Sequence, residues 1–127
     1  MKNKHILFSL AIIAVMLVAC KKKPDTIAKI TIYNSLNNQV VPECRVILWG
    51  KASVGQGTKS QGDVVLYDTA YTNSAGEAIF NYNELYQKGM AGVAILQINA
   101  QKGNYKGEGI IKVEEETTSE TTVYIQP

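Results

Sequence analysis

Apolar and polar residues alternate along most of the chain after residue 26. The stretch IAKITIY at 27–33 places Ala28, Ile30 and Ile32 on one face of an extended chain and mostly polar side chains on the other. A period of two, with many β-branched and aromatic residues, is typical of half-buried strands. The pattern therefore predicts a first strand here, with one face in a core and the other in water.

The same alternation recurs at fairly even intervals and predicts about seven strands. The predicted strand segments are 27–33, 44–49, 63–72, 77–82, 92–100, 103–113 and 121–127. Residues 92–100 have a high apolar density, which favours a central place in a sheet. Gly107 and Gly109 indicate either a bulge or the close approach of another segment. The expected fold is an all-β sandwich of two antiparallel sheets.

Three segments interrupt the strand pattern. The segment 50–62 is rich in glycine and serine, and it predicts a long, mobile loop. The turn NSAG at 73–76 predicts a hairpin between the strands on either side. Asn81 stands three residues before Glu84, a spacing typical of a capping box, so one short helical turn is expected there.

The first nineteen residues have the three parts of a secretory signal. Lys2 and Lys4 form a basic start, and an apolar segment follows at 6–19. A membrane span needs roughly 20 apolar residues, so this segment is short for a permanent anchor. The sequence therefore predicts an export signal over residues 1–19 that is removed.

The tetrapeptide Leu17, Val18, Ala19 and Cys20 resembles a bacterial lipobox. The resemblance implies that Cys20 becomes the first residue of the mature protein and carries fatty acyl chains such as palmitate. The alternative is an ordinary signal peptide with an accidental cysteine. Two or three acyl chains hold a protein at a membrane durably, whereas one holds it only marginally. Residues 20–26 are then a lipidated tether.

Charge excludes a broad nucleic-acid surface on the folded part. Removal of residues 1–19 takes two of the thirteen basic residues, which leaves eleven against eleven acidic ones. Three of those eleven are the lysines at 21–23, so the remainder is net negative. These lysines either lie against lipid headgroups or form a solvated tether.

Cys44 has no partner for an intrachain disulfide once Cys20 carries lipid. It alternates with Val46 and Leu48, which predicts a small buried apolar residue rather than a reactive thiol.

Four stretches resemble the transthyretin-like, carboxypeptidase-regulatory-like β-sandwich family. They are QVVPECRVILW, YTNSAGEAIF, VAILQINAQKGNY and TTVYIQP. The resemblance spans nearly all of residues 27–127 and implies one Ig-like Greek-key sandwich domain. Its motifs specify turns. The chain departs from the pattern twice: Asn37 and Asn38 stand in place of the glycine of the first turn, and Cys44 stands in place of a smaller residue.

Enzymes on related sandwiches fit the sequence poorly. Transthyretin-related hydrolases need histidines and a C-terminal Tyr-Arg-Gly-Ser, and sandwich dioxygenases need histidine and tyrosine for iron. The only histidine is His5, within the signal. Glu114, Glu115 and Glu116 lack the spacing of a calcium loop and predict a solvated turn. No enzyme activity, cofactor or metal site is expected.

The expected function is a non-catalytic envelope lipoprotein that acts as a structural, adhesive or assembly module. Its partners would be the membrane, through the anchor, and another envelope protein or a glycan. The alternative is an anchored carbohydrate-binding module that uses the segment 50–62 with Trp49, Tyr82 and Tyr86, although tyrosines are ordinary on sandwich faces. The expected location is the outer membrane, with the periplasmic side favoured and the cell surface as the other option.

Overall fold

The computed structural model describes residues 23–54, 61–84 and 93–127, with side chains described at all of these positions except 52–54 and 61–64. These residues form seven strands: β1 (Ile27–Asn34), β2 (Arg45–Val54), β3 (Gln61–Tyr71), β4 (Glu77–Asn81), β5 (Val93–Lys102), β6 (Tyr105–Glu114) and β7 (Thr118–Ile125). They make a three-stranded sheet in the order β4-β1-β7 and a four-stranded sheet in the order β3-β2-β5-β6. The all-β sandwich predicted from the alternation is confirmed.

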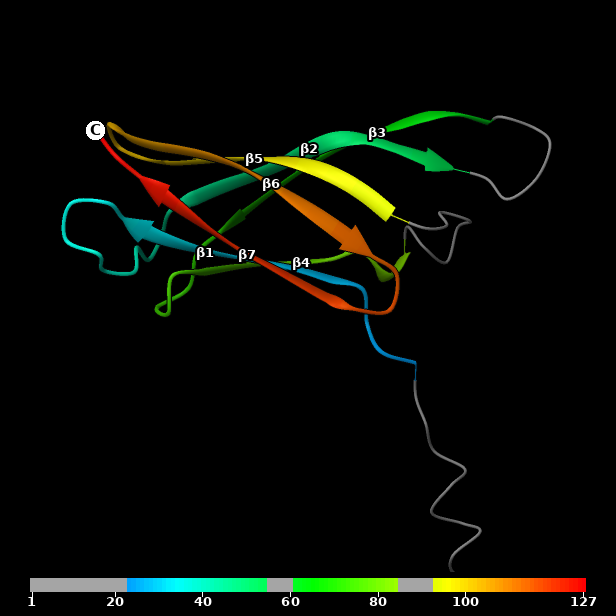
Figure 1. The fold of residues 1–127 in the computed structure, drawn as a ribbon, viewed down its shortest axis with the longest axis horizontal. Coiled ribbons are helices and arrows are strands. Elements are labelled where there is room, and N and C mark those ends of the chain that lie inside the picture. Colours follow the sequence, from blue (N-terminus) through cyan, green and yellow to red (C-terminus); the bar gives the residue numbers. More distant parts are fainter. Residues whose placement is uncertain (1–22, 55–60, 85–92) are drawn as a thin grey trace, which may run out of the picture.

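The two sheets lie face to face, as Figure 1 shows, with the four-stranded sheet above the three-stranded one. β5 pairs with both β2 and β6, so the prediction of a central strand at 92–100 is confirmed. One pairing differs from the expected antiparallel pattern, because β1 and β7 run parallel from Ile27↔Thr118 to Asn34↔Ile125. Strands so far apart in sequence have no connecting turn to set their relative direction.

Among the described side chains, alternate residues of most strands face the space between the sheets. β1 buries Ala28, Ile30 and Ile32, as its sequence pattern predicted. The largest fully buried side chains are Ile30, Ile32, Leu48, Leu96, Ile98, Ile125, Val46, Val113 and Cys44. Burying an aliphatic side chain of this size contributes about 1.5–3 kcal/mol, so this shared layer holds the sheets together.

The predicted loop at 50–62 is wrong at both ends. β2 continues to Val54 and β3 begins at Gln61, with a register shift between Ala52 and Val54. Glycine and serine have a low intrinsic preference for strands, so the composition predicted a loop. The backbone hydrogen bonds between β2 and β3 nevertheless extend both strands into this segment. Only residues 55–60 of that segment lie outside the described residues.

The predicted hairpin at 73–76 is also wrong, although its tight turn is present. Asn73 donates from its backbone nitrogen to the Glu77 carbonyl at 2.9 Å, and Gly76 takes a positive φ of 74°. β3 then pairs with β2 while β4 pairs with β1, so the turn carries the chain from one sheet to the other. A turn sequence specifies that the chain reverses direction, but it does not specify which sheet the next strand joins.

The predicted helical turn lies mostly outside the described residues. Its first part is seen where the Asn81 side chain accepts a hydrogen bond from the Asn83 backbone nitrogen at 3.0 Å, as expected of a capping residue. Within the described part of the chain, no helix has the length and apolar character needed to cross a membrane.

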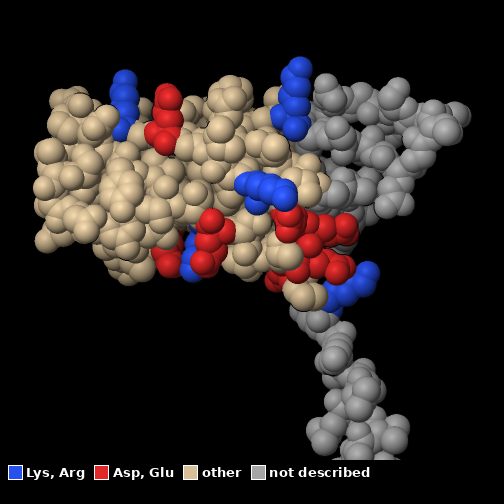
Figure 2. Space-filling view, viewed as in Figure 1, with Lys and Arg blue, Asp and Glu red and all other residues tan. Residues whose placement is uncertain are grey.

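The two ends of the sandwich differ in charge on the face that Figure 2 shows. The chain enters β1 at the end that we call the tether end, where buried Thr26 donates from its backbone nitrogen to Asn83 Oδ1 at 2.6 Å. The Thr26 hydroxyl oxygen accepts from the Glu116 backbone nitrogen at 2.8 Å, and exposed Lys23 lies 3.7 Å from the Glu116 carboxylate. Figure 2 shows acidic side chains gathered where the chain enters and few charges toward the opposite end, which we call the far end.

Candidate functional site

The predicted site residues do not form one site. Cys20, with the lipobox residues Leu17, Val18 and Ala19, lies outside the described residues, and so does Tyr86. Tyr82 is only 3% exposed and stacks on Phe80 in the core, with ring centroids 6.4 Å apart. Tyr82 also lines part of a cavity beside β3 and β4, and its role as a ligand contact stays a prediction. Among the predicted contacts with described side chains, Trp49 alone lies on an outer face.

Trp49 stands in the middle of the outer face of the four-stranded sheet. Its indole nitrogen donates to the Asn99 side-chain oxygen at 3.0 Å once the Asn99 amide is turned to satisfy both of its ends. Trp49 pairs with Tyr67 on β3 and with Gln97 on β5, and Gln97 pairs with Ile110 on β6. These four residues form a row that crosses the whole sheet.

Large apolar side chains surround this row. Five residues of the outer face are between 61% and 68% exposed: Val65, Tyr67, Tyr71, Ile95 and Ile110. They come from β3, β5 and β6, and Trp49 and Ile47 on β2 lie between them. We call this set of seven residues the outer apolar face. Lys51, Gln97 and Asn99 lie among them on the same face. Large exposed apolar patches rimmed by polar residues mark interaction sites.

The outer face of the three-stranded sheet is more polar. Lys29 at its centre contacts Glu77 at 3.4 Å and Glu120 at 2.9 Å, and these carboxylates hold the pKa of Lys29 above its usual value, Glu120 most strongly. The exposed apolar residues there are Ile79 and Tyr124. The contrast makes the four-stranded sheet the better candidate for a contact surface.

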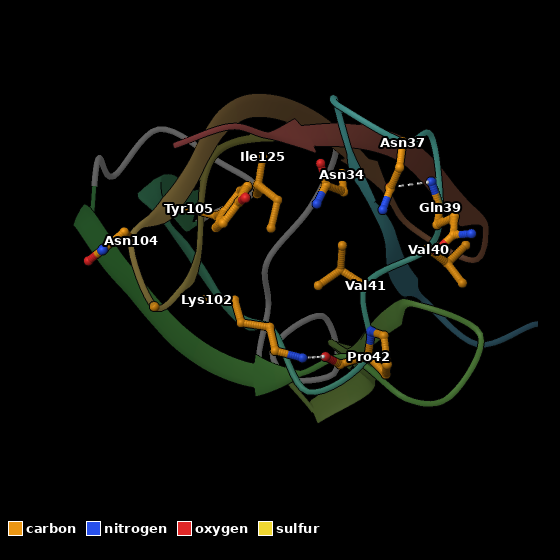
Figure 3. Close-up of a pocket in the computed structure, with 11 residues that line it drawn as sticks. Asn34, Asn37, Gln39, Val40, Val41, Pro42, Lys102, Asn104, Tyr105 and Ile125 are labelled. Atoms are coloured by element: carbon orange, nitrogen blue, oxygen red, sulfur yellow. Dashed lines mark hydrogen bonds between the residues drawn. The ribbon is translucent and has the colours of Figure 1, made fainter.

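A cavity of about 660 Å³ opens at the far end of the sandwich. It lies between the β1–β2 connection, the β5–β6 turn and the end of β7 (Figure 3). Val41 and Ile125 supply buried apolar surface, and Tyr105 packs against the core beside them. The polar lining side chains are Asn34, Asn37, Gln39, Lys102, Asn104 and the hydroxyl of Tyr105.

Local hydrogen bonds fix the walls of this far-end cavity. Asn34 Oδ1 accepts from the Leu36 backbone nitrogen at 2.9 Å, and Asn37 Oδ1 accepts from the Gln39 backbone nitrogen at 3.0 Å. Asn38 takes a positive φ of 55°, a conformation that asparagine tolerates better than most residues. Lys102 Nζ donates to the Pro42 carbonyl at 2.6 Å and joins the two loops. The cavity is therefore preformed.

Buried Thr72 anchors the loop that carries Val41. The Thr72 hydroxyl donates to the Val41 carbonyl at 2.6 Å and accepts from the Cys44 backbone nitrogen at 2.8 Å. The Thr72 backbone nitrogen also donates to the Cys44 carbonyl at 3.0 Å. One threonine thus ties the end of β3 to the residues that precede β2.

Cys44 is fully buried, and its thiol is not a candidate nucleophile. Burial raises the pKa of the Cys44 thiol, and a backbone hydrogen bond at Gln101 and the charge of Lys102 offset only part of that rise. A thiolate, which is the reactive form, is therefore disfavoured in the folded protein. The prediction of a small buried apolar residue is confirmed.

The raised pKa of Cys44 makes a testable contribution to stability. Because the folded-state pKa lies above the ordinary thiol value of 9.0, this contribution is complete below pH 9 and declines as pH rises through the folded pKa. We expect Cys44→Ala to cost about 1 kcal/mol at neutral pH. Urea denaturation should show that cost shrinking above pH 9, and a cost that is constant with pH would contradict a buried neutral thiol.

Two carboxylates border another cavity, of about 440 Å³, beside β3 and β4. They belong to Asp68 and Glu84, and both residues are exposed. Acid–base catalysis by a pair of carboxylates requires that their environments separate their two pKa values, usually because one of the two carboxylates is buried.

Among the described residues, no group of three or more His, Cys, Asp or Glu side chains is placed to hold a metal ion.

No family model matches the chain, and no curated protein matches it either. Among solved structures, the fold is similar to that of a point mutant of catechol 1,2 dioxygenase from Acinetobacter radioresistens. The TM-score is 0.51 and the identity 14%, over 81% of this chain and 52% of that one. The chain thus spans about half the length of that enzyme. At this identity the likeness concerns the fold alone.

Proposed function

We propose that the chain is a non-catalytic lipoprotein of the cell envelope, held by acylated Cys20, whose β-sandwich is an assembly module for another envelope protein. The proposal places the domain at the outer membrane, with the periplasmic side favoured. The anchor rests on the lipobox at 17–20. The contact surface is the outer apolar face of the four-stranded sheet.

The observation that carries the proposal is the composition of this face. Protein interfaces are enriched in tyrosine and tryptophan and depleted of charge at their centre. Tyr67, Trp49 and Ile110 share the central row with Gln97. Charged residues lie in the rows on either side, since Lys51 pairs with Val65, Lys112 with Ile95 and Glu108 with Asn99. The central row itself carries no charge, and charged side chains flank it.

The position of the tether supports the same role. Residues 23–26 leave β1 at the tether end, as Figure 1 shows in blue, and they do not cross the outer apolar face. A partner held at the same membrane has a raised effective concentration, as linked binding modules do. A modest contact surface then suffices for stable association.

Photo-cross-linking from Gln97 tests the proposal. A photoreactive residue at this position should form one discrete adduct with an envelope protein in intact cells. Replacing the neighbours with Tyr67→Thr and Ile110→Thr should reduce that adduct at least about tenfold, because truncating aromatic and apolar anchors removes most of the binding energy of an interface. Threonine keeps a β-branched residue in each strand.

The opposite sheet offers a matched control. Tyr124→Thr with Ile79→Thr makes the same two changes at residues that are about half exposed on the three-stranded sheet. This variant should keep the adduct in full. Loss of the adduct in both variants, or in neither, would refute the assignment of the outer apolar face.

A further inference from the structure

We propose that the far-end cavity binds an acidic sugar, a pyranose ring that carries one carboxylate. The sequence suggested a carbohydrate site at Trp49, Tyr82 and Tyr86, but Tyr82 is only 3% exposed. The far-end cavity offers a different and better-formed site. It involves neither the tether nor the outer apolar face.

Three polar side chains of its lining, those of Asn34, Asn37 and Lys102, have hydrogen-bond donors left for a ligand. The oxygen atoms of the Asn34 and Asn37 side chains accept from backbone nitrogens within their own turns. Their NH₂ groups are therefore the atoms left to face the cavity, and Figure 3 shows both nitrogens on the cavity side. Lys102 uses one of its three ammonium protons on Pro42 and retains two. An acceptor-rich ligand fits this lining.

Charge selects a ligand with a single negative charge. Lys102 is the one charged residue among the eleven that line the cavity, and no carboxylate is among them. One ammonium balances one carboxylate. A phosphate group carries up to two negative charges at neutral pH and is recognised best by arginine clusters, which the described lining lacks.

Size and apolar surface favour a ring. A volume of about 660 Å³ falls in the usual range of roughly 300–1,000 Å³ for small-molecule sites. The partly exposed Tyr105 ring and Pro42 supply apolar surface on which the C–H face of a pyranose can pack, above the buried Val41 and Ile125, while its hydroxyls reach the amides at the rim. The apolar surface thus complements the ring of an acidic sugar, and Lys102 complements its carboxylate.

Ligand-observed NMR on the detergent-purified full chain tests this proposal. The probes are methyl glucuronide, methyl glucoside, acetate and a tripeptide with a free C-terminal carboxylate. Methyl glucuronide should bind at least about tenfold more tightly than each of the other three, because only it has both the ring and the charge. No binding of methyl glucuronide at millimolar concentration, equal binding of methyl glucoside or acetate, or tighter binding of the tripeptide would overturn the proposal.

Asn34→Asp tests most directly whether the side chain of Asn34 donates to the ligand. The new side chain is isosteric and still accepts from the Leu36 nitrogen, but it replaces the donor that faces the cavity with a carboxylate oxygen. Binding of methyl glucuronide should weaken about tenfold or more through like-charge repulsion. Asn73→Asp is the control, since Asn73 Oδ1 accepts from Ala75 and Glu77 in a turn outside the cavity lining.

A second pair of variants keeps the test decisive if Asn34→Asp does not fold. Lys102→Met removes the ammonium and retains the apolar stem, and Lys112→Met does the same at an exposed site on β6. Lys102→Met should lose the preference for methyl glucuronide over methyl glucoside, while Lys112→Met should keep it. Unchanged preference in Lys102→Met would overturn the role of the cation. Tyr67→Thr with Ile110→Thr should leave sugar binding intact, which separates this proposal from the proposed function.

Discussion

Gly107→Val should lower the free energy of unfolding by about 3 kcal/mol or more. A Cβ at Gly107 would overlap the backbone carbonyl oxygen of Tyr124 and lie 2.9 Å from a methyl carbon of Val123 and 3.0 Å from one of Ile125. β7 would have to move away from β6. That movement would break the backbone pair between Lys106 and Gln126, at 2.9 and 3.0 Å, and expose Ile125.

Urea denaturation of the purified chain, followed by the fluorescence of Trp49, measures the effect of Gly107→Val. Glu108→Val is the matched control, because it introduces the same side chain at the next residue of β6, which is exposed. The control should stay within about 0.5 kcal/mol of the parent. If Gly107→Val were equally mild, β7 would not pass as close to β6 as the structure shows.

The alternation of apolar residues predicted the strands well because burial between two sheets acts on alternate positions. Gly107 and Gly109 predicted either a bulge or a close approach, and the structure shows the close approach, because both face residues of β7. The alternation did not predict which strands share a sheet. Pairing of β1 with both β4 and β7 depends on contacts between segments up to 91 residues apart, from Ile27 to Thr118. Such contacts leave no local pattern.

The assignment of Tyr82 shows how two local signals can compete. Ala78 and Phe80 are buried at alternate positions of β4, and continuing that alternation places Tyr82 inside the core. The capping-box spacing of Asn81 and Glu84 instead favoured a helical turn that includes Tyr82. Burial determined the outcome for Tyr82. The same reasoning on β3, where Leu66 is buried, identifies Tyr67 as an outer-face residue.

The far-end cavity had no counterpart in the sequence prediction. Its walls come from the loop at 34–42, the turn at 102–105 and Ile125, which are far apart along the chain. Each is an ordinary turn or strand end when taken alone. Only the packing of β1, β5 and β7 brings their amide, ammonium and apolar groups around one space.

The proposed lipid anchor predicts that Cys20→Ser loses its lipid attachment to the membrane. In Cys20→Ser, the hydroxyl cannot replace the thiol that receives the acyl chain, so the variant should keep its signal and lack lipid. Each buried CH₂ of an acyl chain contributes about 0.8 kcal/mol, so loss of two or three chains removes the durable attachment of the mature chain. Cys44→Ala is the control, because Cys44 is buried in the folded domain and should not affect processing.

The mass of the N-terminal peptide from the membrane fraction tests the anchor most directly. We predict that the parent and Cys44→Ala begin at Cys20 and carry fatty acyl chains on that residue, and that Cys20→Ser yields no peptide cut before residue 20. A mature parent chain that begins elsewhere, or that begins at Cys20 without acyl groups, would contradict the account.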